Sequence, residues 1–180
     1  MSKHSSRNPR LRTAEAADAE AITRLINAAF QVERFFLGAD RIDIAEVRAR
    51  LARGTFILAE EDGAIIGCVY VEPDGERAYL GLLSVEPSVQ RAGIGKRLMD
   101  AAEDHCRAAG CRFMDLRVVN VRTDLPPYYQ KLGYVETGDM PFPEEVRTII
   151  PCLADHVQAA YSSRNPALNN GRPPSAVWNA

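Results

Sequence analysis

The sequence has no apolar run of the ~20 residues that a helix needs to cross a bilayer. It also has no excess of basic residues, because 22 Lys and Arg stand against 24 Asp and Glu, a net charge of −2. This balance gives no reason to expect binding to nucleic acid. Residues 1–10 are basic, but the apolar segment of a secretory signal does not follow them. We therefore expect a cytoplasmic protein that binds neither membrane nor nucleic acid.

Cysteine is scarce, and no two of the four cysteines form a Cys-x-x-Cys pair. All four fall inside expected strands or helices, so we interpret them as buried free thiols in a reducing compartment. A metal or redox site is the alternative interpretation, and we predict no metal. The residues concerned are Cys68, Cys106, Cys111 and Cys152.

A chain of 180 residues without internal repeats is long enough to bury a sizeable core and favours a single domain. We expect this domain at residues 10–161, after a flexible N-terminus at 1–9. Residues 162–180 are rich in Asn, Pro, Ser and Gly, which predicts a disordered tail. Trp178 lies in this tail, where it either docks on a surface or belongs to a mobile end.

Apolar periodicity and turn residues predict a mixed α/β fold. Three strands form an antiparallel meander, and a helical crossover then places the next strand parallel to the third of them. Asp18 looks like the N-cap of the first helix. Strands are expected at 11–14, 55–59, 64–71, 77–85, 113–119, 134–137 and 146–153, and helices at about 19–29, 44–53, 95–109 and 128–132.

The stretch from Tyr79 to Gly110 organises the chain as a strand, a glycine-bearing turn and a long helix. Such a turn points backbone N–H groups outward at the positive end of a helix dipole, which is suited to phosphate. Gly93 and Gly95 lack a Cβ, so an anion can approach the backbone itself. Arg91, Lys96 and Arg97 add cationic side chains nearby. A plain strand-to-helix turn is the alternative.

Two familiar phosphate loops do not fit this turn. A dinucleotide-binding fingerprint needs a third glycine where this sequence has Leu98. A Walker A loop needs a glycine where Gln90 stands and a Ser or Thr where Arg97 stands.

The turn instead resembles the pyrophosphate loop of the GNAT superfamily, the acyl-CoA-dependent N-acetyltransferases, in Val85-x-Pro87-x-x-Gln90-x-x-Gly93-x-Gly95. Downstream, Tyr128 to Tyr134 is similar to the family's Tyr-x-x-x-Gly-Phe/Tyr segment, and residues 11–30 are similar to its opening. The resemblance covers about residues 10–153. It implies the GNAT fold, a mostly antiparallel mixed sheet of about seven strands with a central splayed parallel pair and about four helices.

The resemblance also implies acetyl-CoA as the cofactor, with CoA as the product. In the family, unpaired backbone groups of the fourth strand bind the pantetheine arm in the manner of an added strand. The turn amides bind the diphosphate. In the family an Asn seven residues before the tyrosine also contacts the cofactor; that position is Arg122 here, and Asn120 stands two residues earlier. The residues implied are Leu83, Ser84, Val85, Gln90, Arg91, Ala92, Gly93, Ile94, Gly95, Lys96, Asn120 and Tyr129.

By the same resemblance, Tyr129 is the general acid that protonates the leaving thiolate, because it stands four residues before Gly133. A base must take a proton from the acceptor, since an alkyl ammonium has a pKa near ~10.4. Many relatives carry a carboxylate where this chain has Tyr79, so Tyr79 holds a water or shapes the acceptor pocket. The base is unassigned, with Glu72, Glu76, Glu86 and Glu33 as candidates.

The family places Phe35 and Phe36 in a loop that lines the acceptor pocket; the alternative is that both pack under the loop. Arg122 either neutralises an acidic group of the acceptor or cofactor or is a solvated loop residue. The resulting prediction is an enzyme that moves an acetyl group from acetyl-CoA to a primary amine by direct attack in a ternary complex. A non-catalytic acyl-CoA sensor is one alternative. An interaction protein using the tail is another, and a homodimer stays open.

Overall fold

The computed structural model describes residues 8–31, 40–119, 122–141 and 158–164. The chain divides into two compact units. Of the described residues, the first unit holds 8–31, 40–72 and 82–102, and the second holds 73–81, 103–119, 122–141 and 158–164.

A seven-stranded sheet runs in the order β1-β2-β3-β4-β5-β7-β6. The pair β4–β5 is parallel, whereas β1–β2, β2–β3, β5–β7 and β6–β7 are antiparallel. This confirms the predicted mixed sheet and its parallel pair. The strands are β1 Arg10–Thr13, β2 Thr55–Glu61, β3 Ala64–Asp74, β4 Arg77–Val85, β5 Phe113–Val119, β6 Val135–Pro141 and β7 Gln158–Arg164.

Four α-helices are described, α1 Ala19–Ala29, α3 Ile44–Arg53, α4 Ile94–Ala108 and α5 Leu125–Lys131, with short 3₁₀ turns η1 Ala16–Asp18 and η3 Pro87–Val89. Helix α1 buries Ala19, Ile22, Leu25 and Ile26, which recur at helical spacing and so share one face. Helix α3 begins after Asp43, whose carboxylate accepts a hydrogen bond from the Glu46 backbone N–H at 2.7 Å. None of the helices in the described ranges has the length and apolar character of a membrane span.

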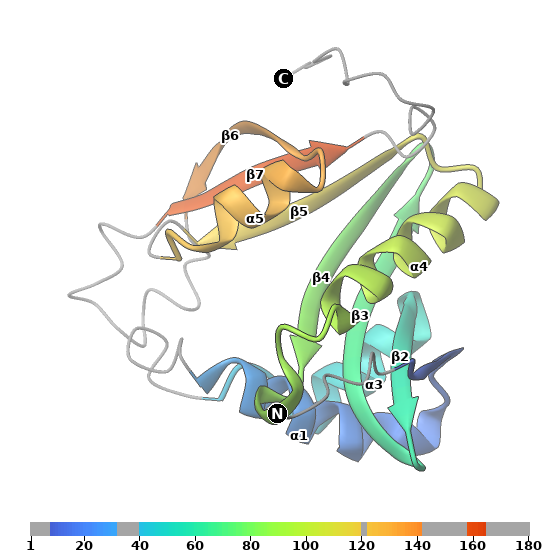
Figure 1. The fold of residues 1–180 in the computed structure, drawn as a ribbon. Coiled ribbons are helices and arrows are strands. Elements are labelled where there is room, and N and C mark those ends of the chain that lie inside the picture. Colours follow the sequence, from blue (N-terminus) through green and yellow to red (C-terminus); the bar gives the residue numbers. More distant parts are fainter. Residues whose placement is uncertain (1–7, 32–39, 120–121, 142–157, 165–180) are drawn as a thin grey trace. The chain divides into compact units, whose positions relative to one another are not determined.

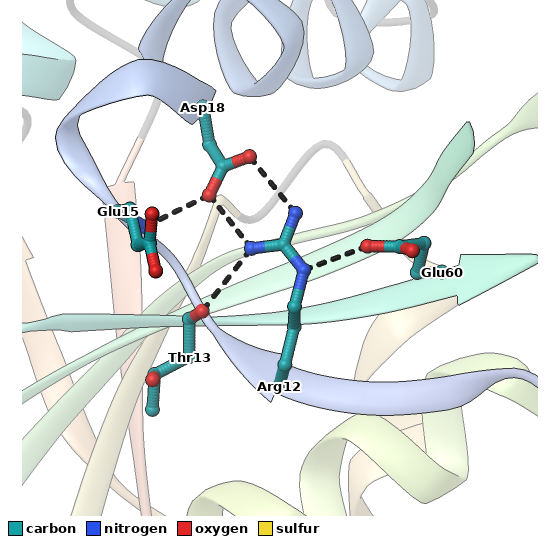
Figure 2. Close-up of polar contacts among 5 residues, drawn as sticks. All are labelled: Arg12, Thr13, Glu15, Asp18 and Glu60. Carbon is teal, nitrogen blue, oxygen red and sulfur yellow. Dashed lines mark hydrogen bonds and ion pairs between the residues drawn. The ribbon is translucent and has the colours of Figure 1, made fainter. Parts of the chain in front are cut away.

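In the first unit, a three-residue ion-pair cluster ties β1, η1 and β2 together (Figure 2). The Arg12 guanidinium donates to the Asp18 carboxylate at 2.7 and 2.9 Å and to Glu60 at 2.7 Å. Asp18 also accepts from the Glu15 backbone N–H at 2.8 Å, and its side chain makes no cap bond to α1. Asp18 therefore stands at the N-cap position of α1, as predicted, but its carboxylate is bound by Arg12 and η1 in place of the helix N–H groups.

The second unit differs from the prediction near its end. Strand β6 continues to Pro141, past the expected end at Thr137. Its register with β7 shifts by an extra residue near Gly138 (φ +147°), and the pairing then resumes. Strand β7 lies between β5 and β6 (Figure 1) and includes three residues that we expected in the tail, so folded structure reaches Arg164. The strand expected at 146–153 lies outside the described residues.

Candidate functional site

Strand β4 is paired with β5 only along its first half. Its parallel register with β5 covers Arg77–Leu80 against Phe113–Leu116, and the strand then continues to Val85. Leu82 has φ +53°, a conformation that is uncommon for a residue with a side chain and that bends the strand there. The buried Ser84 hydroxyl donates to the Leu82 carbonyl at 3.0 Å, which holds the bend from inside. Leu83 and Val85 consequently present their half-exposed face on the other side.

The segment after β4 is fixed by three hydrogen bonds to its surroundings. The Glu86 N–H donates to the Ile66 carbonyl at 2.9 Å, and the Val89 N–H closes η3 onto Glu86 at 2.9 Å. The Gln90 side-chain amide then reaches back to the Val85 carbonyl at 3.2 Å. Gln90 thus fixes the base of the turn to the end of β4, which is a structural role for the first residue of the motif.

We call residues Gln90–Lys96 the phosphate turn. Arg91 and Gly93 have φ of +66° and +81°, so the chain reverses sharply before α4 begins. The Arg97 N–H bonds the Gly93 carbonyl at 3.1 Å, whereas the helix itself gives the preceding N–H groups, those of Ile94 to Lys96, no partner. Arg91, Ala92 and Gly93 are exposed, and a Cβ on Gly93 would meet no atom within 4 Å.

These features fit the diphosphate of acetyl-CoA, because an anion of that size has open space at Gly93, the N–H groups of a helix start and a helix dipole to meet it. On the same helix, the Arg97 Nη1 is buried and has no hydrogen-bond partner among the described residues. Lys96 forms an ion pair with Asp100 at 2.5 Å and is exposed. The charge of Lys96 is therefore partly neutralised. We expect the backbone N–H groups of the turn to contribute more than Lys96 to anion binding.

Gly67 on β3 lets the start of α4 approach the sheet closely. A Cβ at this position would lie 2.9 Å from Leu98 Cδ1, 3.1 Å from Ile94 Cγ2 and 3.3 Å from the Ser84 carbonyl oxygen. Ile94 and Leu98 are fully buried against this strand. Gly67 was not among the predicted site residues, because a glycine inside a strand signals a close approach only in general terms.

Tyr129 belongs to the second unit and lies on α5, where it is 8% exposed. Its ring meets the rings of Tyr128 and Tyr134 edge-on, at centroid distances of 5.2 and 5.8 Å. Tyr128 is half-exposed, and the two tyrosines differ in burial as expected for neighbours on a short helix. Helix α5 begins at Leu125, three residues before the expected start, and Pro126 lies in its first turn.

The base candidates Glu72 and Glu76 both have structural partners. Glu72 accepts from the Tyr70 hydroxyl at 2.5 Å and lies 4.0 Å from Arg53. Burial and this carboxylate raise the pKa of Tyr70 to about 12. Glu76 pairs with Arg112 at 3.2 Å in the turn before β4. Glu33 lies outside the described residues, so the base stays unassigned.

Tyr79 is half-buried on the side of β4 opposite Leu80. The Arg117 guanidinium lies 5.5 Å from its ring centre, and the ring extends along the strand over Gly81. A Cβ on Gly81 would meet the Tyr79 hydroxyl at 2.4 Å, so only a glycine there leaves room for the ring. The Tyr79 hydroxyl therefore lies beside Gly81, and its role in holding a water or shaping the acceptor pocket stays a prediction.

Three of the expected contacts, Phe35, Phe36 and Asn120, lie outside the described residues. Arg122 donates two hydrogen bonds to Asp124 at 2.9 Å, and this pairing lowers the pKa of the Asp124 carboxyl. The ion pair gives Arg122 a structural role, and nothing in it favours acceptor binding.

The cysteines of the described ranges are unsuited to nucleophilic catalysis. Cys68, Cys106 and Cys111 are buried free thiols, as predicted, and Cys152 lies outside those ranges. Burial raises the pKa of Cys68 and of Cys106 to about 12, so neither forms a thiolate near neutral pH. Within the part of the chain that the structure describes, no group of three or more His, Cys, Asp or Glu is arranged to hold a metal.

Comparisons with solved structures show the fold. The ribosomal-protein-alanine N-acetyltransferase of Brucella melitensis is 14% identical, with a TM-score of 0.69 over 87% of this chain and 99% of that one. The Escherichia coli ribosomal-protein-S18-alanine N-acetyltransferase is 16% identical, with a TM-score of 0.69 over 88% and 94%. The Salmonella typhimurium protein yncA, solved with its cofactor acetyl-CoA, is 20% identical, with a TM-score of 0.66 over 93% and 98%.

No curated protein matches the chain significantly. A family model described as the acetyltransferase (GNAT) family matches residues 19–134, which run from α1 to the residue before β6 and include the phosphate turn and Tyr129. The chain therefore belongs to the GNAT family of acetyltransferases.

Proposed function

We propose that the protein is a cytoplasmic N-acetyltransferase that moves the acetyl group of acetyl-CoA to a primary amine by direct attack in a ternary complex. One observation carries this proposal: α4 starts next to open space at Gly93, shortly after the bent strand β4, and its Arg97 Nη1 is buried without a hydrogen-bond partner among the described residues. That combination suits a long ligand with a diphosphate at one end and a hydrogen-bonding arm along β4.

In this proposal the phosphate turn and Arg97 hold the diphosphate, and the backbone of Leu83–Val85 pairs with the pantetheine arm. Acetyl-CoA supplies an acyl group already activated as a thioester. Tyr129 donates its proton to the departing sulfur, and the burial of its ring limits the access of water to this step. The deprotonating group is not assigned. The candidates are a water held by Tyr79 and the carboxylates of Glu33, Glu72, Glu76 and Glu86.

The acceptor is a small amine, a protein N-terminus or a lysine side chain. Two of the structural neighbours are alanine N-acetyltransferases acting on ribosomal proteins, so a peptide with N-terminal alanine belongs in the acceptor screen. The near-neutral net charge of −2 favours neither a polycationic nor an acidic acceptor.

The experiment combines calorimetry with acetyl-CoA and a free-thiol assay over a panel of amines and peptides. We expect micromolar binding and CoA release with at least one acceptor. Absence of binding at high micromolar acetyl-CoA would contradict the proposal as a whole. Binding without turnover on any acceptor would instead identify a non-catalytic acyl-CoA sensor, which the missing carboxylate at Tyr79 favours.

A further inference from the structure

Glu103 on α4 is a carboxylic acid with only 2% of its surface exposed. It shares that burial with Ser84 alone among the polar and charged side chains of the described residues. Burying a carboxyl group costs free energy unless its oxygens find donors, and a leucine would fill the same space without that cost. The presence of a carboxyl here therefore calls for a role, and the acyl-transfer steps proposed above do not use it.

The Tyr134 hydroxyl lies against this carboxyl. It donates to Glu103 Oε1 at 3.3 Å and lies 3.2 Å from the sulfur of Met114 on β5. Tyr134 is 2% exposed, so its hydroxyl depends on protein groups for hydrogen bonds. At the other end of the residue, the Tyr134 backbone N–H donates to the Tyr129 carbonyl at 3.0 Å. Both ends of Tyr134 are thus anchored, one to α4 and the other to α5.

The anchored ring of Tyr134 contacts the ring of Tyr129. The two planes meet at 71°, with centroids 5.8 Å apart, which is the edge-to-face arrangement that aromatic pairs prefer. Tyr128 contacts Tyr129 in a similar way, at 69° and 5.2 Å. The ring of Tyr129 therefore lies between two aromatic neighbours, and of these two Tyr134 is the one whose hydroxyl is bonded to a buried carboxyl.

We propose that Glu103 and Tyr134 are positioning residues for Tyr129. The hydrogen bond to Glu103 fixes the Tyr134 ring, and that ring fixes the direction of the Tyr129 phenol. This inference rests on the proposed role of Tyr129 as the general acid. In this role Glu103 contacts neither substrate. It accepts the hydrogen bond from Tyr134 and so holds that ring in place.

Three single variants separate this role from general packing. Tyr134→Phe keeps the ring and removes the hydroxyl, Glu103→Leu removes the acceptor, and Glu103→Gln keeps an acceptor oxygen while removing the charge. We expect kcat to fall about 5- to 10-fold in the first two variants, with the KM for acetyl-CoA unchanged. Glu103→Gln should retain kcat within about 2-fold. Cys106→Ala, which alters a buried side chain one turn along α4, is the matched control and should retain kcat.

A double-mutant cycle makes the test specific to Tyr129. Tyr134→Phe and Glu103→Leu break the same hydrogen bond, so the double variant should be no slower than either single one. In a Tyr129→Phe background, both substitutions should change kcat by less than about 2-fold, because no phenol is left to position. Wild-type kcat in the folded Tyr134→Phe variant, or equal losses with and without Tyr129, would overturn the inference.

The outcomes also separate this inference from the proposed function. If Tyr129→Phe lowers kcat and Tyr134→Phe does not, only the positioning role is wrong. If Tyr129→Phe retains full kcat, the acid assignment is wrong and the positioning role falls with it. Should Glu103→Leu fail to fold, Tyr134→Phe completes the test alone, since it changes a single oxygen atom.

Discussion

The phosphate turn and the group formed by Tyr128, Tyr129, Tyr134 and Glu103, which we call the tyrosine cluster, are built from different parts of the chain. The turn is made of backbone: a glycine with open space beside it and the N–H groups at the start of a helix. The tyrosine cluster is made of side chains, with three aromatic rings packed edge-on and one hydroxyl bonded to a buried carboxyl.

This difference predicts opposite sensitivities to mutation. A side-chain truncation in the phosphate turn leaves the N–H groups in place, whereas an added Cβ or a shifted helix disturbs them. In the tyrosine cluster, loss of one hydroxyl removes the functional atom, although the backbone stays unchanged. The turn should therefore control cofactor affinity, and the cluster should control the rate of the chemical step.

The largest expected effect is that of Tyr129→Phe. We expect kcat to fall about 100-fold, because general acid catalysis by one side chain contributes on that order or more. The Kd for acetyl-CoA should remain within about 2-fold, since the diphosphate and pantetheine contacts are made elsewhere. Steady-state kinetics and calorimetry measure the two quantities. Tyr128→Phe is the matched control, and an equal loss of kcat in both variants would refute the assignment.

The next effect compares two glycines with nearly the same backbone conformation. Gly93 (φ +81°) and Gly63 (φ +78°) both have open space where a Cβ would stand, so alanine imposes the same backbone strain at each. Gly93→Ala also places a methyl group at the anion site. We expect the Kd for acetyl-CoA to rise about 10-fold, or 1.4 kcal/mol, in Gly93→Ala and to stay unchanged in Gly63→Ala.

Equal affinities in these two variants, measured by calorimetry at the same temperature, would show that the phosphate turn does not approach the cofactor. Thermal denaturation serves as the control measurement, because the two substitutions should lower Tm by similar amounts.

A smaller effect is expected at Gly67, where the disturbance reaches the turn indirectly. Alanine there would press on Leu98 and Ile94, and overpacking of this kind costs about 1–3 kcal/mol of folding free energy. A displaced helix start should weaken acetyl-CoA binding about 3-fold. Leu98→Val shortens the side chain that the new methyl group meets, so the double variant should recover part of the stability. Denaturant unfolding and calorimetry check both points, and a neutral Gly67→Ala would contradict the close packing of α4.

The smallest effect concerns two aspartates, one in each unit. Arg12 lowers the pKa of Asp18, and Arg122 lowers the pKa of Asp124. Each ion pair therefore stabilises the fold fully at pH values above 3.8, the ordinary pKa of aspartate. The stabilisation is lost as the pH falls through the lowered value, when the carboxylate takes up a proton. The Asp18 side chain is 15% exposed and that of Asp124 is 65% exposed, so solvent weakens the second pair more.

We expect Asp18→Asn to lower the free energy of unfolding at pH 7 by about 1 kcal/mol and to flatten its decline below pH 4. Asp124→Asn should have a much smaller effect. Denaturant unfolding from pH 7 to pH 3 measures both variants, and the opposite order of effects would show that burial does not control the strength of these pairs.

The sequence was most informative where local rules decide the structure. The ends of β4 and β5 match the prediction to the residue, because alternation, Pro87 and the turn at Gly75 are local signals. The phosphate turn was likewise predictable, since its glycines and the change in apolar period stand within one short segment. The same holds for α3, which begins after its capping Asp43.

Features that depend on distant contacts were not predictable. The bend at Leu82 follows Gly81, but a glycine in a strand does not by itself predict a positive φ at the next residue, and the Ser84 hydroxyl holds the bend through the Leu82 carbonyl. Asp18 occupies the predicted N-cap position, but the ion pair of its carboxylate with Arg12 could not be read from local signals. The role of Glu103 was hidden for the same reason, since Tyr134 is 31 residues away in the sequence. Strand β7 was not predicted, because long-range pairing with β5 and β6 defines it.

The most direct test of the account is a backbone amide NMR titration of the protein with CoA, compared with pantetheine, which lacks the diphosphate. We predict large shifts of the N–H resonances of residues 91–96 with CoA, and small shifts of these resonances with pantetheine. Shifts confined to other segments, or equal shifts with both ligands, would contradict the claim that the phosphate turn binds the diphosphate.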